Sequence, residues 1–297
     1  MKTLLEIIRH FSDEQTCINT VSRLRWMDGK PTCPRCAGQD VLWLQNQRRW
    51  KCRLKNCKKQ FFVKVGTIFQ DCPLSLDKWL VAMWLICNCK NGVSSYEIAR
   101  DLGITQKSAW HMMHRIREAM RDNSLLLSGT IEMDETFIGG KIKNMHKSKR
   151  PVGPGFSGKA VAGTAKTIVV GMLERSGRVR AQVVQDRTRT TLHAIAHANI
   201  ASGSELITDE HHPYKGVDFR HRIINHAETY VQGRIHTNGI ENFWSLLKRG
   251  LGGTYVSVEP FHLFRYIDEQ AFGITTVRIG TMKSGQLRFS LRSRASG

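Results

Sequence analysis

The stretch HTNGIENFWSLLKR, residues 236–249, begins and continues like an amphipathic helix. Asn238 is the expected N-cap, and Glu241 follows three positions later, which is the spacing of a capping box. Apolar residues then recur at helical spacing, while Glu241, Ser245 and Lys248 share another face of the predicted helix. A carboxylate two turns before a lysine on an exposed face suits a site that holds a divalent metal ion against phosphate.

Two further carboxylates complete the expected site. The segment IEMDETFI, residues 131–138, alternates apolar and polar residues and predicts a strand with Glu132 and Asp134 on one face. The segment LITD, residues 206–209, predicts a short buried strand with Asp209 at its C-terminal end, where α/β sheets place ligands. Such oxygen ligands select Mg²⁺ or Mn²⁺ rather than zinc. The pattern alone therefore indicates metal-dependent phosphodiester chemistry.

The three carboxylates and Lys248 together resemble the catalytic residues of DDE transposases. The segment EMDETFIGGK, residues 132–141, and the helix quoted above closely resemble one bacterial group, the ISXO-type insertion-sequence transposases with an N-terminal zinc ribbon. The resemblance implies an α/β fold with a ribonuclease-H-like catalytic domain, preceded by a zinc ribbon and a helix-turn-helix segment. The expected boundaries are 12–70 for the ribbon, 74–124 for the helix-turn-helix segment, 128–272 for the catalytic domain and 273–297 for a divergent tail.

The expected mechanism uses two Mg²⁺ or Mn²⁺ ions held by the two aspartates, with Glu241 completing one shell. They would activate water and steady the leaving oxygen of an in-line displacement. The resemblance further implies strand transfer, in which a freed 3′-hydroxyl attacks target DNA. Lys248 would hold phosphate as a point charge. His236 and Asn238 either support the metal ligands or only cap the helix.

Charge favours a polyanionic partner, since 45 Lys and Arg against 25 Asp and Glu give the 297 residues a formal charge of +20. We expect double-stranded DNA, both the terminal inverted repeats of an element and its target, bound by a homo-oligomer by analogy. The sequence contains no run of about 18 apolar residues, so no membrane span is predicted. The N-terminus lacks the features of a secretion signal, so we expect a cytoplasmic protein on the bacterial nucleoid.

Four of the eight cysteines occur as two close pairs, which predicts a closed tetrahedral site for structural zinc. Disulfides are a poor alternative in a chain without an export signal. Segments 41–44 and 48–51 predict two strands of the ribbon, and segment 61–65 a third. The other four cysteines receive no role. The expected zinc ligands are Cys33, Cys36, Cys52 and Cys57.

Three helices are predicted at 75–88, 94–100 and 106–121, and Gly103 lies in the turn between the second helix and the third. This is the helix-turn-helix pattern, although many such hairpins are only structural. In the third helix, Ala109, Trp110, Met113 and Ile116 should pack inward. The side chains expected to face a groove are Gln106, Lys107, His111, His114, Arg115 and Arg117.

Segments 167–173 and 178–184 predict a hairpin, segment 190–200 a helix and segment 222–224 a further strand. The Gly/Lys-rich loop from 139 to 159 is a candidate DNA clamp. His193 and His197 lie four apart, but no Glu of the HExxH type lies between them, so we interpret them as surface or packing residues. The residues expected to contact DNA are Lys107, His111, Arg115, Lys141, Lys143, Lys147 and Arg249.

The tail departs from the family after Phe272, where GITTV stands in place of a sequence like RYNNR. Codons for RYNNR with the first base deleted can read GITTV, so we hypothesise that residues 273–297 are translated out of frame. Ordinary divergence of a terminal tail is the alternative. A frameshift would leave the carboxylates in place but make the activity of this copy less certain than its ancestry.

Two rival functions remain. A zinc-ribbon and helix-turn-helix regulator would explain residues 30–121 and the charge, but it leaves the three carboxylates unused. A ribonuclease-H-type nuclease would explain the carboxylates without transposition. Metal-dependent cleavage excludes the regulator, and joining of the cleaved ends excludes the simple nuclease.

Overall fold

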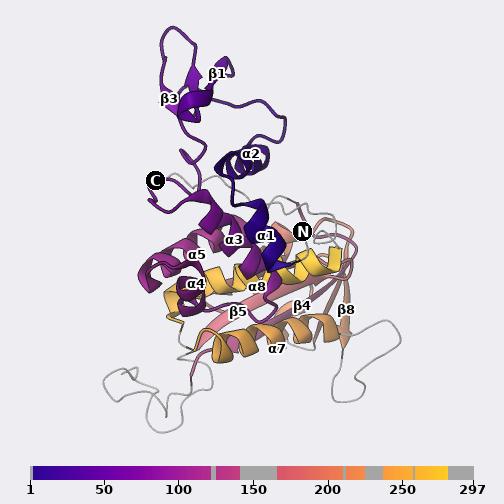
Figure 1. Cartoon of the computed structure of the whole chain (residues 1–297). Helices are drawn as coiled ribbons and strands as arrows, with labels where there is room; N and C mark the ends of the chain where they lie inside the picture. Colours follow the sequence, from indigo (N-terminus) through magenta and orange to yellow (C-terminus); the bar gives the residue numbers. More distant parts are fainter. Residues whose placement is uncertain are drawn as a thin grey trace, which may run out of the picture. The chain divides into compact units, whose positions relative to one another are not determined.

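A computed structural model describes residues 3–121, 125–140, 166–209, 212–224, 237–256 and 258–279 (Figure 1). Within these ranges the chain divides into two compact units, and the first ends at Arg121. No helix in the described ranges is long and apolar enough to cross a membrane.

The first unit begins with two capped helices and a small antiparallel sheet. The hydroxyl of Thr3 caps α1, and the carboxylate of Asp13 caps α2 by accepting a hydrogen bond from the backbone N–H of Thr16 at 2.7 Å. The sheet has the strand order β1-β2-β3. The elements are α1 (Leu4–His10), α2 (Glu14–Arg25), β1 (Val41–Leu44), the 3₁₀ turn η1 (Gln45–Gln47), β2 (Arg49–Cys52) and β3 (Gln60–Phe61).

The first two ribbon strands match the prediction, but the third is shorter and starts earlier than segment 61–65. The chain turns directly after β3, because the backbone N–H of Val65 donates to the carbonyl of Phe62 at 3.1 Å. A turn at this point uses backbone groups that a longer strand would have needed for its ladder. The prediction that the strand continues to residue 65 was wrong, although apolar residues alternate after Phe61.

Three helices follow, as predicted: α3 (Leu76–Asn88), α4 (Ser95–Leu102) and α5 (Gln106–Met120). Ser94 and Glu97 form a capping box at the start of α4. Gly103 ends that helix in the left-handed region, with φ +60°, which a residue without a Cβ adopts at little cost. Thr105 then caps α5.

The second unit contains a mixed five-stranded sheet in the order β6-β5-β4-β7-β8. β4, β5 and β6 pair antiparallel, whereas β7 and β8 run parallel to β4. The strands are β4 (Thr130–Ile138), β5 (Thr167–Glu174), β6 (Val179–Val184), β7 (Glu205–Asp209) and β8 (Arg220–Ile224).

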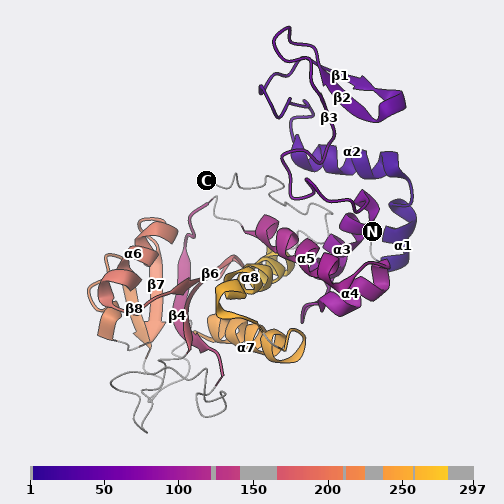
Figure 2. The same ribbon diagram turned by 90° about the vertical axis from the view of Figure 1, so that its left-hand side faces the viewer.

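Helices cover both faces of this sheet (Figure 2). One face, with Ile131 and Met133 of β4, packs against α6. The other face packs against α7 and α8, through residues such as Phe243 and Ile267. The remaining elements are α6 (Arg189–Asn199), the 3₁₀ turn η4 (His212–Tyr214), α7 (Asn238–Gly253), the 3₁₀ turn η5 (Pro260–His262) and α8 (Leu263–Ile279).

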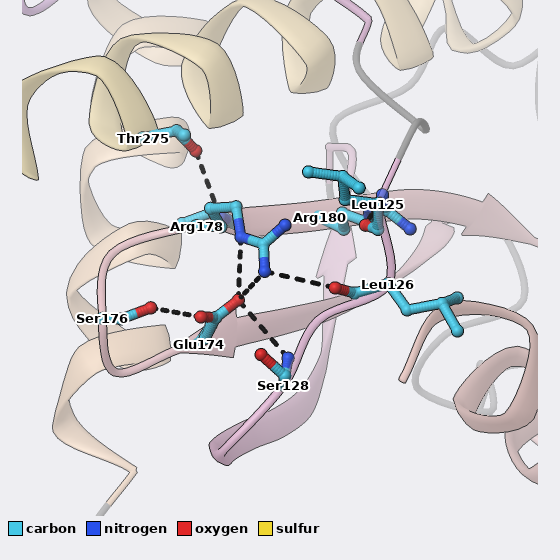
Figure 3. Close-up of polar contacts among 9 residues, drawn as sticks. Leu125, Leu126, Ser128, Glu174, Ser176, Arg178, Arg180 and Thr275 are labelled. Carbon is cyan, nitrogen blue, oxygen red and sulfur yellow. Dashed lines mark hydrogen bonds and ion pairs between the residues drawn. The ribbon is translucent and has the colours of Figure 1, made fainter. Parts of the chain in front are cut away.

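A buried ion pair fixes the residues that lead into β4 (Figure 3). The carboxylate of Glu174, at the end of β5, lies 2.8 Å from Nη2 of Arg178 and accepts from the backbone N–H of Ser128 at 3.5 Å. The same guanidinium donates to the carbonyl of Leu126 at 3.2 Å. Arg180 donates to the carbonyl of Leu125. The β5–β6 hairpin thus holds the chain just before it enters the sheet.

Helix α8 continues through Gly273, where the sequence departs from the family, and ends at Ile279. The hydroxyl of Thr275 accepts a hydrogen bond from the backbone N–H of Val179 at 3.1 Å (Figure 3). Ile274 packs against the apolar cluster that contains Phe243 and Ile267. The beginning of the segment is therefore helical. Residues 280–297 lie outside the described ranges, and the out-of-frame reading stays a prediction.

Candidate catalytic and metal sites

The four predicted zinc ligands converge on one point. The Sγ atoms of Cys33 and Cys57 lie 3.8 Å apart, those of Cys36 and Cys52 lie 3.6 Å apart, and all four lie within 4.8 Å of one another. A tetrahedral zinc ion with Zn–S bonds of about 2.3 Å requires sulfur atoms roughly 3.8 Å apart. The thiol cluster fits structural zinc in size and in ligand type.

The local backbone explains why the cysteine pairs close around one point. The residue after each pair, Ala37 or Lys58, has φ near +50° and turns the chain back. Burial disfavours the thiolate of Cys33, but the backbone N–H groups of Arg35 and Cys36 and the neighbouring thiols donate hydrogen bonds that lower its pKa to about 7.

Two of the other thiols shift the opposite way. A backbone hydrogen bond from Gly38 lowers the pKa of Cys36, but burial and the neighbouring thiols outweigh it and raise this pKa to about 12. Burial also raises the pKa of Cys52. A thiolate is the form that binds metal, so zinc binding must release protons from these cysteines.

Asp134 and Asp209 lie on neighbouring parallel strands. In the register between β4 and β7, Glu132 pairs with Ile207, and each aspartate follows two residues further along its own strand. Residues two apart on a strand share a face, so both carboxylates lie on the face of the sheet that α7 covers. Glu241 lies in the first turn of α7.

The charges of the three carboxylates act on one another. The pKa of Asp134 is raised to about 6 by burial and by the negative charges of Asp209 and Glu241, against hydrogen bonds from Glu135 and Trp244 that lower it. Within the described ranges, only the cysteine cluster has three or more ligand atoms within 4.8 Å of one another. The carboxylates are thus close enough to repel but are spread more widely than the sulfurs.

The start of α7 differs from the sequence prediction. The helix begins at Asn238, so Asn238 is not its N-cap, and the true cap Thr237 makes no side-chain cap hydrogen bond. Instead, the carboxylate of Glu132 on β4 accepts from the backbone N–H of Ile240 at 3.0 Å. The hydroxyl of Thr237 donates to Oε1 of Glu241 at 3.0 Å. His236 lies outside the described ranges.

Glu132 is buried beneath the helix it caps, with only 1% of its surface exposed. Nε of Arg175 lies 3.2 Å from its Oε1 and supplies the opposite charge. A buried carboxylate is costly unless it is paired and hydrogen-bonded, and here both conditions hold. The sequence pattern placed Glu132 on the correct face but gave it no role, because its partner on α7 is 108 residues away.

Trp244 is a second contact that the sequence analysis missed. Its indole Nε1–H donates to Oδ2 of Asp134 at 2.9 Å, and the ring is buried. On β5, Gly171 pairs with Asp134, and a Cβ at Gly171 would lie 2.6 Å from the indole ring. The available signal was a Trp three residues after Glu241 on the apolar stripe, because a buried indole N–H needs an acceptor.

Glu135 points to the opposite face of β4, toward Tyr214, which is almost fully buried. The pKa of Glu135 is raised to about 7 by burial and by the charges of Asp134 and Asp209. The nearby hydroxyl of Tyr214 and the charge of Arg187 oppose the rise. Sequence analysis did not single out this pair.

The predicted phosphate and DNA contacts divide into three groups. Lys248 and Arg249 are exposed on α7, and Lys248 shares a helical face with Glu241. On α5, Lys107 and His111 are exposed, while the guanidinium of Arg115 lies 5.9 Å from the ring centroid of Trp79. The members that lie outside the described ranges are Lys141, Lys143 and Lys147, with most of the predicted clamp loop.

Two of the residues expected to face a groove are buried instead. His114 is 3% and Arg117 1% exposed, so neither side chain is available at the surface. Trp110, expected to pack inward, is half-buried with its ring 4.1 Å from that of His114. The sequence pattern therefore predicted too wide an exposed face for α5, because polar side chains on an amphipathic helix can also be buried against neighbouring groups.

His193 is half-buried and His197 is exposed, in line with the prediction of surface or packing residues. Nε2 of His193 lies 3.1 Å from the carbonyl oxygen of Pro213, and the ring of His197 lies 5.1 Å from that of Phe219. Neither belongs to a metal-binding group among the residues that the structure covers.

Among known proteins, a relative from Halobacterium salinarum (strain ATCC 700922 / JCM 11081 / NRC-1) is described as an uncharacterized protein in transposable element ISH50. It is 22% identical over 255 residues, which cover 82% of this chain and 85% of the relative. A solved structure, the cryoEM structure of the simian T-cell lymphotropic virus intasome in complex with PP2A regulatory subunit B56 gamma, is 19% identical. That match covers 56% of this chain and 57% of the other, and its TM-score of 0.25 supports no conclusion.

Two family models match this sequence. One, described as a transposase zinc-ribbon domain, matches residues 12–60 and contains all four clustered cysteines. The other, described as an ISXO2-like transposase domain, matches residues 126–274, which is half of the chain and includes the three carboxylates. The chain therefore belongs to the ISXO2-like transposase family.

Proposed function

We propose that this transposase cleaves DNA at the ends of the element that encodes it and joins those ends to target DNA. The observation that carries the proposal is the approach of Asp134, Asp209 and Glu241 from two adjacent parallel strands and a covering helix. The sheet supports it, because three antiparallel strands, a helix, two parallel strands and a final acidic helix are the order of a ribonuclease-H-like domain.

The three carboxylates suit Mg²⁺ or Mn²⁺. Their oxygens are hard ligands, and their mutual repulsion, which raises the pKa of Asp134, is relieved when a cation binds between them. When bound, two such ions supply an activated water and stabilise the charge on the leaving oxygen. The chain's own part is to hold the three carboxylates in place. Lys248, exposed on the same helical face as Glu241, attracts a DNA phosphate toward them.

DNA recognition is assigned to the first unit. Helices α4 and α5 form a helix-turn-helix segment, in which α5 presents exposed Lys107 and His111. The proposed domain boundaries remain 12–70, 74–124 and 128–272. Arg115 and Arg249 add positive charge, and Lys141, Lys143 and Lys147 remain expected contacts. A homo-oligomer on paired ends is proposed by analogy with other transposases.

A three-way assay separates this function from its rivals. Zinc-loaded full-length protein is incubated with Mg²⁺, a supercoiled plasmid and linear DNA that carries the genomic sequences flanking the gene. A transposase cuts the flanking DNA and joins it to the plasmid, whereas a nuclease cuts without joining and a regulator binds without cutting. Scrambled flanks serve as the control. Sequencing the flanks first identifies terminal inverted repeats and shows whether an RYNNR frame lies one base away from the tail.

Lys107→Ala should weaken binding to the element ends and flatten the salt dependence. Each lysine on a phosphate releases counterions, so losing one contact lowers the slope of log K against log salt by about 1. Fluorescence anisotropy at several salt concentrations measures this slope. Lys90→Ala is the matched control, because it removes the same charge from an exposed position outside α5. Equal slopes for the wild type and Lys107→Ala would exclude Lys107 from the interface.

A further inference from the structure

Two hydrogen bonds join β4 to α7 at matched spacing. The carboxylate of Glu132 accepts from the backbone N–H of Ile240, and the carboxylate of Asp134 accepts from the indole N–H of Trp244. Two residues along a strand advance by about 6.6 Å and four residues along a helix by about 6 Å. Both bonds therefore form together when the helix and the strand lie alongside each other.

Each of these bonds depends on a glycine. A Cβ at Gly239 would lie 2.7 Å from Oε2 of Glu132, and a Cβ at Gly171 would lie 2.6 Å from the ring of Trp244. Real Cβ contacts at such distances force a shift of the neighbouring atoms. Glycine thus leaves room for the Glu132 carboxylate beside Gly239 and for the Trp244 ring beside Gly171.

From this arrangement we infer that Glu132 and Trp244 are positioning residues, which set the separation of Asp134 and Glu241 before metal or DNA binds. Glu241 directly follows Ile240, whose N–H is bonded to Glu132, so this bond fixes the turn that carries Glu241. The indole orients the Asp134 carboxylate directly. The inference rests on the proposed function, because it gives both residues a purpose only if these carboxylates bind metal.

Ordinary core packing is a weaker explanation of the same contacts. Packing alone needs neither a charge nor a hydrogen-bond donor at these positions, and burying the carboxylate of Glu132 is unfavourable unless its bonds are used. Partners that orient metal ligands typically change metal affinity by about 10- to 100-fold when they are removed. The two explanations therefore predict different metal affinities for variants that lack these hydrogen bonds.

The test is a Mn²⁺ titration of zinc-loaded full-length protein, with free Mn²⁺ measured by electron paramagnetic resonance. Trp244→Phe keeps an aromatic ring in the core but lacks the N–H, and it should raise the half-saturating Mn²⁺ concentration about tenfold. Leu247→Val trims a buried side chain one turn further along the apolar stripe of α7 and should leave the concentration unchanged. Circular dichroism checks that each variant is folded.

Gly171→Ala tests the same bond while the indole is retained. The added methyl group displaces the ring of Trp244 from Asp134, so Mn²⁺ binding should weaken about as much as in Trp244→Phe. In the double variant the losses should not add, because one bond can be lost only once. Wild-type affinity in both single variants, or fully additive losses, would overturn the inference.

Failure of the proposed function gives a different result. Asp134→Asn is the reference, and it should abolish the Mn²⁺ binding that the wild type shows. If Asp134→Asn binds like the wild type, the carboxylates are not the metal site and the proposed function fails. If Asp134→Asn loses binding but neither Trp244→Phe nor Gly171→Ala does, the proposed function stands and only the positioning role is wrong.

Discussion

Glu241→Gln is expected to slow cleavage and joining by about three orders of magnitude and to leave binding to the element ends unchanged. The amide keeps the size of the side chain but loses the negative charge that a metal ligand needs. Metal-based stabilisation of a phosphoryl transition state contributes several kcal/mol, and about 4 kcal/mol corresponds to a thousandfold. Single-turnover rates on end-labelled DNA measure the effect.

Two controls show that the loss is chemical. Glu259→Gln makes the same change at an exposed position outside the triad and should have full activity. Thermal melting should show no destabilisation of Glu241→Gln, since the charge of Glu241 repels Asp134 and its removal relieves that repulsion. A Gln variant with wild-type rates would refute the three-carboxylate mechanism.

Cys52→Ser should release the zinc and unfold the ribbon. Between Cys33 and Phe61 the buried apolar side chains besides the cysteines are Trp50 and Phe61, which pack with Trp26, so the metal must supply much of the folding free energy of this part of the ribbon. Structural zinc contributes about 10–16 kcal/mol of apparent binding free energy in small zinc domains. Zinc content by mass spectrometry and near-ultraviolet circular dichroism of the tryptophans report the two events.

Cys72→Ser provides the matched control for this change. Cys72 is half-buried and lies outside the four-cysteine cluster, so its variant should keep its zinc and its near-ultraviolet spectrum. Full zinc occupancy in Cys52→Ser would show that the cluster does not need all four thiolates.

Local patterns predicted the elements well because their causes are local. Strand alternation placed Asp134 correctly on its face, and cap residues such as Thr105 predicted helix starts to within a residue or two. The sequence did not predict that β4 and β7 are neighbours in the sheet, since their paired residues, such as Thr130 and Glu205, lie 75 residues apart. The same reason explains the missed roles of Glu132 and Trp244, whose partners lie more than 100 residues away.

The errors have physical causes too. Asn238 satisfied the capping rule, but the backbone N–H it would have bonded lies close to Glu132, and a long-range carboxylate took its place. His114 and Arg117 carry polar groups on long or flat side chains, and these were assigned to solvent from charge alone. Burial of such groups depends on neighbours that periodicity along one helix does not reveal.

Arg178 and Arg180 donate hydrogen bonds to the carbonyls of Leu126 and Leu125. These bonds limit how the N-terminal part of one such protein can be joined to the C-terminal part of another. A hybrid that takes its N-terminal part from a relative and keeps this chain from Leu125 onward retains every acceptor of the two arginines. Because the acceptors at Leu125 and Leu126 are backbone carbonyls, a crossover within this segment keeps both contacts, whichever side chains the relative supplies, as long as the length of the segment is unchanged. Viable recombinants should therefore tolerate a breakpoint here but not an insertion or a deletion between Leu125 and Ser128.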